Sequence, residues 1–232
     1  MKIAVMQPYL FPYLGYFQLI QAVDIFVIFD DVNYINRGWI NRNRILTERG
    51  EQLITLKLSK ASQNKLINEI AILDTNENKE CIYNKIKLAY TKAPQFSKVM
   101  PLLEKALFQS EQQLSRYIEF SLKVIAEYLQ IKTRFIRSSN IEKDASLKSQ
   151  EKILAIIKKL GGKSYYNSIG GLQLYDKQIF HDHGIQLHFI EMDDIRYRQF
   201  DDNYYTCLSI IDPLMFNDQS TVCELLNRYT LK

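Results

Sequence analysis

At the start of the chain, the pattern of hydrophobic and polar residues predicts a strand, a loop, a helix and a second strand. Residues 2–6 form an apolar run without polar alternation, as in a strand buried on both faces. The loop 7–17 carries two prolines that prevent a helix from running through it, and Gly15 permits close backbone approach where the helix begins. A second apolar run covers residues 24–29. Polar side chains therefore follow each of two neighbouring apolar strands.

The centre of the chain has helical spacing instead. Apolar residues recur at helical intervals in residues 76–93, 99–108 and 112–129. Before them, residues 53–58 alternate like a half-buried strand, and residues 67–73 can pair with it. We therefore predict a single domain, residues 1–232, with a helical section at roughly 76–129 within it.

Strand patterning returns in the last part of the chain. Strands are predicted at residues 133–136, 164–167 and 186–192, and helices at 149–160, 176–183, 208–216 and 221–229. Alternation of strands and helices before and after the helical section favours a mainly parallel sheet. The predicted fold class is α/β, a Rossmann-like sheet flanked by helices, with an inserted helical section.

Composition narrows the class of protein. Lys and Arg number 30 against 26 Asp and Glu, a weak and evenly spread excess that suits an anionic small molecule and not nucleic acid. Three widely spaced cysteines predict free thiols in a reducing compartment. The apolar start is broken by Gln7 and two prolines and lacks a small-residue cleavage site, and no apolar run approaches the ~20 residues of a membrane span. We expect a cytoplasmic protein without membrane insertion.

Candidate site residues follow the first two strands, because ligands of open parallel sheets bind beyond the carboxyl ends of the strands. In the first loop, Gln7 can read an amide or hydroxyl, Tyr9 and Tyr13 can hydrogen-bond or stack, and backbone N–H groups near Gly15 favour an anion. The alternative is that the loop only packs and turns.

Three polar residues after the second strand form the next candidate group. Asp30 and Asp31 can hold a hydroxyl or a magnesium ion, with Asn33 beside them. A solvated strand end is the alternative, since acidic residues are common there.

Arginines and asparagines then cluster around the single tryptophan, Trp39. Arginine binds phosphate bidentately, and amides suit sugar hydroxyls or a carboxylate. A solvated loop is the alternative, but lysine and glutamate are more usual in such loops. We expect an anion or substrate site, with the candidates Arg37, Trp39, Asn41, Arg42 and Arg44.

Two later loops of small residues could offer hydroxyls or N–H groups to a phosphate: Ser138 with Ser139, and Gly170 with Gly171. Neither matches the Walker or dinucleotide pattern. The histidines in the segment HDH lack zinc-ligand spacing, so no metal site is predicted. Cys207 could act as a nucleophile in principle, but its apolar context favours a buried thiol.

Several stretches resemble the WbqC-like family. They are QPYLFPYLGYFQLIQAVDIFVIFDDVNYINRGWINRNRI, AYTKAPQF, the pair Ser138-Ser139, YYNSIGGLQLYD and LSIIDPLMFN, which together span most of the chain. YYNSIGG departs from the family in the placing of its glycines. Members of the family are associated with O-antigen and capsule clusters. The resemblance implies a transferase of bacterial surface-polysaccharide biosynthesis, which forms an amide between an acyl or aminoacyl group, such as glycyl, and the amino group of a nucleotide-linked sugar.

Under this hypothesis, the roles of the candidate residues can be assigned. Asp30 or Asp31 accepts a proton from the attacking amine or binds magnesium, and Arg42, with Arg37 and Arg44, holds phosphates or a carboxylate. If the acyl group is activated as an adenylate, the expected cofactor is ATP with magnesium.

Two alternatives remain open at this point. The arrangement strand, loop, glycine-started helix, strand is also similar to nucleotidylyltransferases and pantothenate synthetase, which bind ATP through a His-x-Gly-His loop. Residues 12–16 occupy that place here and contain no histidine. The first alternative is a nucleotidylyltransferase-like enzyme acting on ATP or CTP. The second is a non-catalytic, sugar-nucleotide-binding accessory protein.

Overall fold

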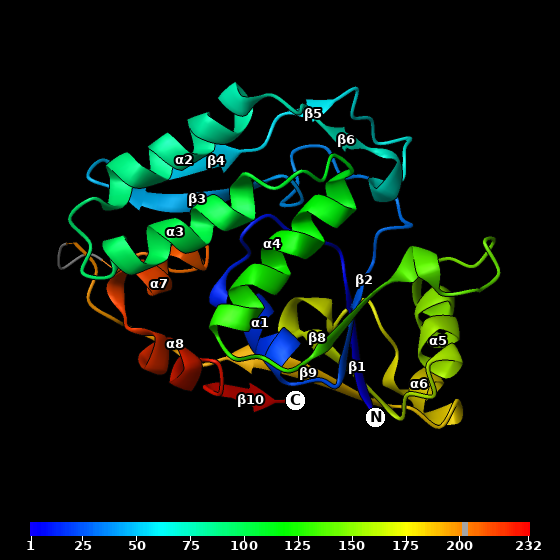
Figure 1. Ribbon diagram of the computed structural model, residues 1–232. Helices are drawn as coiled ribbons and strands as arrows, with labels where there is room; N and C mark the ends of the chain where they lie inside the picture. Colours follow the sequence, from blue (N-terminus) through cyan, green and yellow to red (C-terminus); the bar gives the residue numbers. More distant parts are fainter. Residues whose placement is uncertain (201–203) are drawn as a thin grey trace.

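A computed structural model describes residues 1–200 and 204–232 and shows a mainly parallel, six-stranded sheet with helices on both faces (Figure 1). The predicted α/β class is therefore confirmed. The strand order is β10-β9-β8-β1-β2-β7; β10 is antiparallel to β9 and the other neighbours are parallel. The strands are β1 (Lys2–Met6), β2 (Ile25–Ile28), β7 (Arg134–Arg137), β8 (Ser164–Ser168), β9 (Gln186–Met192) and β10 (Tyr229–Leu231).

The strand order creates a switch point between β1 and β8. From β1 the chain adds β2 and β7 on one side, and then returns to add β8 and β9 on the other. The connections that leave β1 and β8 therefore run in opposite directions, which opens a crevice at the carboxyl ends of these two strands.

The two faces of the sheet have separate hydrophobic cores. Helix α1 (Leu14–Gln21) covers one face, where its fully buried Phe17 belongs to the larger core. Helices α5 (Ser149–Lys159) and α6 (Lys177–Asp182) cover the other, where Ile153 of α5 belongs to the smaller core (Figure 1). Strands β1 and β2 are buried along most of their length, as their unbroken apolar runs predicted.

The expected helical section consists of three helices that extend the larger core. They are α2 (Asn76–Tyr90), α3 (Phe96–Leu107) and α4 (Leu114–Tyr128), and the later helices α7 (Ile211–Phe216) and α8 (Gln219–Leu225) pack into the same core. Within the described ranges, none of the helices has both the length and the apolar character needed to cross a membrane.

The region between β2 and α2 differs from the sequence prediction. Residues 53–55 belong to β4 (Gly50–Thr55), which pairs with β3 (Arg42–Thr47). Of residues 53–58, only Leu58 is in a strand that pairs with the segment 67–73, where β5 (Leu58–Ser59) lies beside β6 (Ala71–Ile72). Strand β3 escaped prediction because its polar residues suggested a loop. These polar residues alternate with side chains that its hairpin and α2 bury.

The end of the chain is a second correction. The predicted helix 221–229 stops at Leu225, and Tyr229–Leu231 forms β10 at the edge of the sheet. Its register is fixed by backbone hydrogen bonds such as Lys232 N to Phe189 O, 2.9 Å. Three residues are too few to show strand periodicity, so only the partner strand reveals this element.

Candidate functional site

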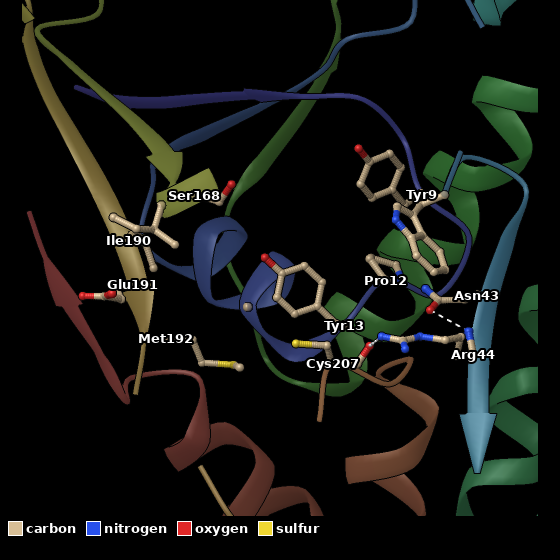
Figure 2. Close-up of a pocket in the computed structure, with 13 residues that line it drawn as sticks. Tyr9, Pro12, Tyr13, Asn43, Arg44, Ser168, Ile190, Glu191, Met192 and Cys207 are labelled. Atoms are coloured by element: carbon tan, nitrogen blue, oxygen red, sulfur yellow. Dashed lines mark hydrogen bonds between the residues drawn. The ribbon is translucent and has the colours of Figure 1, made fainter. Parts of the chain in front are cut away.

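A cavity of about 460 Å³ lies at the switch point, where β1, β8 and β9 end (Figure 2). Its size suits a small organic ligand. The lining comes from the loop after β1, from Trp39 and the start of β3, from the ends of β8 and β9, and from residue 207. The residues are Tyr9, Pro12, Tyr13, Gly15, Trp39, Asn43, Arg44, Ser168, Ile169, Ile190, Glu191, Met192 and Cys207.

Asn43 fixes the loop that forms one side of this cavity. Its buried amide donates to the carbonyls of Leu10 at 3.1 Å and Phe11 at 2.8 Å. The hydroxyl of the buried Ser209 donates to the Phe11 carbonyl as well, at 2.7 Å. Phe11 has a φ of 43°, in the left-handed region that non-glycine residues rarely adopt. These two polar side chains therefore hold the loop in a backbone conformation that its own sequence disfavours.

Tyr13 lies across the first turn of α1, with its ring inside the cavity (Figure 2). A Cβ built on Gly15 would meet Cε2 of Tyr13 at 2.4 Å, so only glycine at residue 15 leaves room for this ring position. Burial raises the pKa of the Tyr13 hydroxyl, and nearby Cys207 and Tyr9 raise it further. The hydroxyl is therefore a neutral hydrogen-bond donor at physiological pH.

Arg44 supplies positive charge at the cavity wall. Its Nη1 lies 2.6 Å from the Glu51 carboxylate, and its Nη2 donates to the Cys207 carbonyl at 3.4 Å. Its Nε is buried and has no hydrogen-bond partner among the described residues. Each of the two Nη nitrogens carries a second N–H besides the one used in the contacts to Glu51 and Cys207, so Arg44 has donor capacity left for a phosphate or carboxylate.

Trp39 places an aromatic face beside that charge. The guanidinium carbons of Arg44 and Arg42 lie 5.5 and 5.8 Å from the centre of its ring system, within cation–π range. The side chain is 42% exposed, so much of the indole surface is open to a ligand.

The opposite wall comes from the ends of β8 and β9. Ser168, Ile190 and Met192 line it, and Glu191 beside them pairs with Lys232 at 3.2 Å (Figure 2). Cys207 closes one side, with its sulfur directed into the cavity (Figure 2). The sequence prediction of a buried thiol was wrong, because Cys207 is exposed in a loop with a φ of 53°.

Comparison with known proteins identifies the family. The sequence pattern of the WbqC-like protein family matches residues 7–224, nearly the whole chain. The protein belongs to the WbqC-like family. It is similar to the uncharacterized protein Rv1507c of Mycobacterium tuberculosis, strain ATCC 25618 / H37Rv, with 29% identity over 219 residues that cover 93% of each chain. No solved structure matches it.

In this WbqC-like protein, the sequence-predicted site residues fall into separate groups. Five of them line the cavity, namely Tyr9, Tyr13, Gly15, Trp39 and Arg44. The structure therefore brings the loop after β1 and the tryptophan-arginine segment to one cavity, and their role in binding stays a prediction.

Asp30 lies outside the cavity lining, at the carboxyl end of β2, and is fully buried. It accepts hydrogen bonds from Ser115 Oγ at 3.1 Å, from Ser139 N at 3.0 Å and from Ser139 Oγ at 2.9 Å. These bonds tie α4 and the turn after β7 to the sheet. Two candidates from separate sequence groups, Asp30 and Ser139, are therefore in direct contact outside the cavity lining.

Asp31 is the centre of a compact ionic group at the same edge. Its carboxylate lies 2.7 Å from Lys143 Nζ and 3.1 Å from Lys152 Nζ, and it accepts a hydrogen bond from Ser138 Oγ. Burial alone would raise the pKa of Asp31, but the hydrogen bonds from Lys143 and Ser138 and the charges of the two lysines outweigh it, so the pKa is lowered. A carboxylate held in this way is a weak base. A catalytic role for Asp30 and Asp31 stays a prediction.

The remaining candidates make hydrogen bonds that stabilise the structure around them. The Gln7 carbonyl accepts from Tyr16 OH at 2.8 Å, and Asn33 donates to the Gln63 carbonyl at 2.9 Å. Asn41 is buried, where it accepts from Tyr34 OH and donates to the Leu56 carbonyl, both at 2.8 Å.

Arg42 closes the turn that precedes it. Its side chain donates to the carbonyls of Gly38, at 2.9 Å, and Arg37. Arg37 itself is exposed, with a φ of 59°. Arg42 lies next to Trp39, outside the cavity lining. Its catalytic role therefore stays a prediction.

The glycine pair follows β8, close to the cavity. Gly171 packs on Asn167, where a Cβ would come within 3.1 Å of the side chain, and Gly170 is exposed. Ser168 and Ile169, directly before the pair, reach the cavity.

Sequence reasoning missed Asn43, Ile190, Met192 and Cys207. The end of β9 could have been found, since it is a third strand end at the ligand edge of a parallel sheet. Asn43 lies within the predicted arginine-asparagine segment but was not selected from it, and Cys207 was set aside as a buried thiol. Within residues 1–200 and 204–232, no group of three or more His, Cys, Asp or Glu is placed to hold a metal ion.

Proposed function

We propose that this WbqC-like protein binds a nucleotide-linked amino sugar in the switch-point cavity and transfers an acyl or aminoacyl group to its amino nitrogen, as a step in bacterial surface-polysaccharide biosynthesis. Membership of the WbqC-like family supports the setting. The observation that carries the proposal is the cavity itself, which lies where α/β sheets of this strand order bind nucleotides.

The chemistry of the lining supports a ligand of this class. Tyr9, Tyr13 and Trp39 offer ring faces for a sugar or base, and the tyrosine hydroxyls and Ser168 can bond to sugar hydroxyls. Arg44 lines the cavity and can donate its remaining Nη hydrogens to a phosphate oxygen.

The reaction balances without further reactants. The amine nitrogen attacks the carbonyl carbon of an activated acyl donor, a C–N bond forms, and the bond from carbonyl carbon to leaving group breaks. The leaving group departs with the electron pair of that bond, and the nitrogen's proton passes to the leaving group or to water. Where the donor is an adenylate, ATP supplies the activation. Among the described residues, the lining contains one carboxylate, Glu191, which is paired with Lys232, so we assign no step to a metal ion.

A binding experiment tests this proposal directly. Isothermal titration calorimetry with UDP-, dTDP- and GDP-linked amino sugars should show one nucleotide class that binds, and Arg44→Ala should weaken it by about tenfold to a hundredfold, since a charge-assisted contact is lost. The exposed Arg49→Ala is the matched control and should bind normally. Equal binding by the Arg44 variant, or no binding of any nucleotide sugar to the intact protein, would refute the proposal.

A nucleotidylyltransferase-like activity is the second candidate, favoured by the strand order and by the glycine-started helix at the switch point. It predicts pyrophosphate release from ATP or CTP in the absence of any amine acceptor. Acyl transfer predicts an amide product only when the amino sugar is present. A third possibility, a non-catalytic accessory protein, predicts binding of the nucleotide sugar but no product with any donor.

A further inference from the structure

A second, smaller cavity of about 20 Å³ adjoins the main one. Tyr13, Met192 and Cys207 belong to the lining of both, so these three side chains form the boundary between them. The small cavity has room for about one water molecule or one methyl group. It therefore extends the main cavity by a space the size of a short substituent.

The described residues that line this side cavity carry no charge. Apart from the three boundary residues they are aliphatic side chains, tyrosines and a proline; those that matter here are Ile195, Leu208, Tyr197 and Tyr204. Moving an ammonium group into such surroundings without a carboxylate partner is costly, whereas a methyl group gains from the transfer. The lining therefore favours an uncharged, apolar group.

A carboxylate does lie behind the side cavity, but it is already occupied. Asp212 is fully buried and accepts from Tyr197 OH at 2.6 Å, from Gln199 Nε2 at 2.8 Å and from Tyr90 OH at 2.9 Å. Both of its oxygens are used by these donors, so it is not free to bind a substrate ammonium.

The same contacts make the wall of the side cavity firm. Tyr197 is anchored on Asp212, and the hydroxyl of Tyr204 donates to the carbonyl of Ile195. Ile195 is itself 4% exposed within the larger core. A wall held by packing and hydrogen bonds resists expansion, so the size of the cavity can determine which substituents fit.

We infer that the side cavity is the acyl subsite, and that it selects a short, uncharged acyl group of one or two carbons over longer acyl groups and over an aminoacyl group such as glycyl. The inference rests on the proposed function, which places the amino sugar in the main cavity. The carbonyl carbon then lies at the boundary beside Tyr13 and Cys207, with the methyl group in the side cavity.

The test is a ligand series that differs only in the acyl group. The probes are UDP-, dTDP- and GDP-linked glucosamine with a free amine or with N-acetyl, N-propionyl, N-butyryl or N-glycyl groups, titrated by calorimetry into the intact protein. The N-acetyl compound of the bound nucleotide class should bind at least about tenfold more tightly than the N-butyryl and N-glycyl compounds, given what one or two methylenes are worth in a tight apolar pocket.

Enlarging the side cavity should weaken the preference for the N-acetyl compound over the N-butyryl compound. Ile195→Ala should raise N-butyryl affinity by about tenfold while N-acetyl affinity changes by less than about threefold. Ile195→Val, a smaller change, should shift the preference in the same direction and serves if the alanine variant does not fold. Leu154→Ala is the matched control, because it removes a similarly buried aliphatic side chain from the core on the opposite face.

The outcomes separate the two proposals. If no nucleotide sugar binds, the proposed function fails. If a nucleotide sugar binds equally with every acyl group, or best with glycyl, or if Ile195 and Leu154 variants behave alike, the proposed function stands and the acyl subsite is overturned.

Discussion

The ring of Tyr13 occupies the space that a side chain at residue 15 would need, since a Cβ on Gly15 would lie 2.4 Å from Tyr13 Cε2. Gly15→Ala should therefore push the ring out of its place in the cavity. We expect a loss of about 1–3 kcal/mol in the free energy of unfolding, typical of overpacking, together with weaker ligand binding. Urea denaturation and calorimetry measure the two effects. Gly170→Ala is the control, because its Cβ would meet nothing closer than Ser168 Oγ at 4.0 Å; an equal effect there would contradict this account.

Asn43 should matter for binding through the loop that it holds. Asn43→Ala removes both hydrogen bonds to the carbonyls of Leu10 and Phe11, which leaves these acceptors unpaired. The free energy of unfolding should fall by about 2 kcal/mol and nucleotide-sugar affinity should fall with it. Asn33→Ala, at an exposed position with one bond to the Gln63 carbonyl, should change neither much. Unchanged affinity in a folded Asn43 variant would show that the loop does not depend on this side chain.

The group around Asp31 should control stability in acid. A carboxylate with a lowered pKa stabilises the folded state fully above its unfolded value of 3.8, and this contribution is lost as pH falls through the folded pKa. Asp31→Asn should cost about 1–3 kcal/mol at neutral pH, because Lys143 and Lys152 lose their carboxylate partner and keep backbone carbonyls as acceptors. The stability difference between wild type and variant should shrink as pH falls below about 4.

Urea denaturation from pH 7 to pH 3 measures this difference, and Asp182→Asn, at an exposed position, is the control. A constant difference across this range would contradict the assigned cause. The same variant tests the sequence-derived catalytic role of Asp31. Lost turnover with unchanged stability would favour catalysis, and lost stability with normal turnover in the folded fraction would favour a structural role.

The rate of chemical labelling of Cys207 should show whether a ligand occupies the cavity. Its thiol is exposed and faces the cavity, whereas Cys81 is exposed on α2, outside the cavity lining. Iodoacetamide should label both residues in the free protein, and a bound nucleotide sugar should slow labelling of Cys207 by about tenfold or more at saturating concentration. Peptide mass spectrometry quantifies both sites in one sample, with Cys81 as the internal control. Equal labelling with and without a bound ligand would place that ligand elsewhere.

Much of the fold could be predicted from local patterns. Apolar runs identified β1, β2 and β9, and helical spacing identified α2, α4 and α5, because burial against a neighbouring layer imposes these periods directly on the sequence. The strands β3 and β10 could not be predicted in this way. In β3 the polar residues line the cavity or hold the loops around it, so they hide the strand pattern. Strand β10 is too short to show a period.

The candidate site, like the fold, could be predicted from the sequence only in part. The sequence alone determined that polar and aromatic residues gather at strand ends, and it selected Tyr13, Gly15, Trp39 and Arg44, which the structure places in one cavity lining. It did not determine which strand ends meet. Asp31 follows β2 and Gly15 follows β1, yet the switch point joins the end of β1 to that of β8, so the two residues belong to different groups.

Only the tertiary structure decided that Arg44 meets Cys207, which lies 163 residues further along the chain. Strand order and loop closure depend on how helices pack between distant segments, and no local period records that choice. The sequence by itself therefore determined the α/β class and the chemistry at the strand ends. The fold decided which of those ends share a cavity.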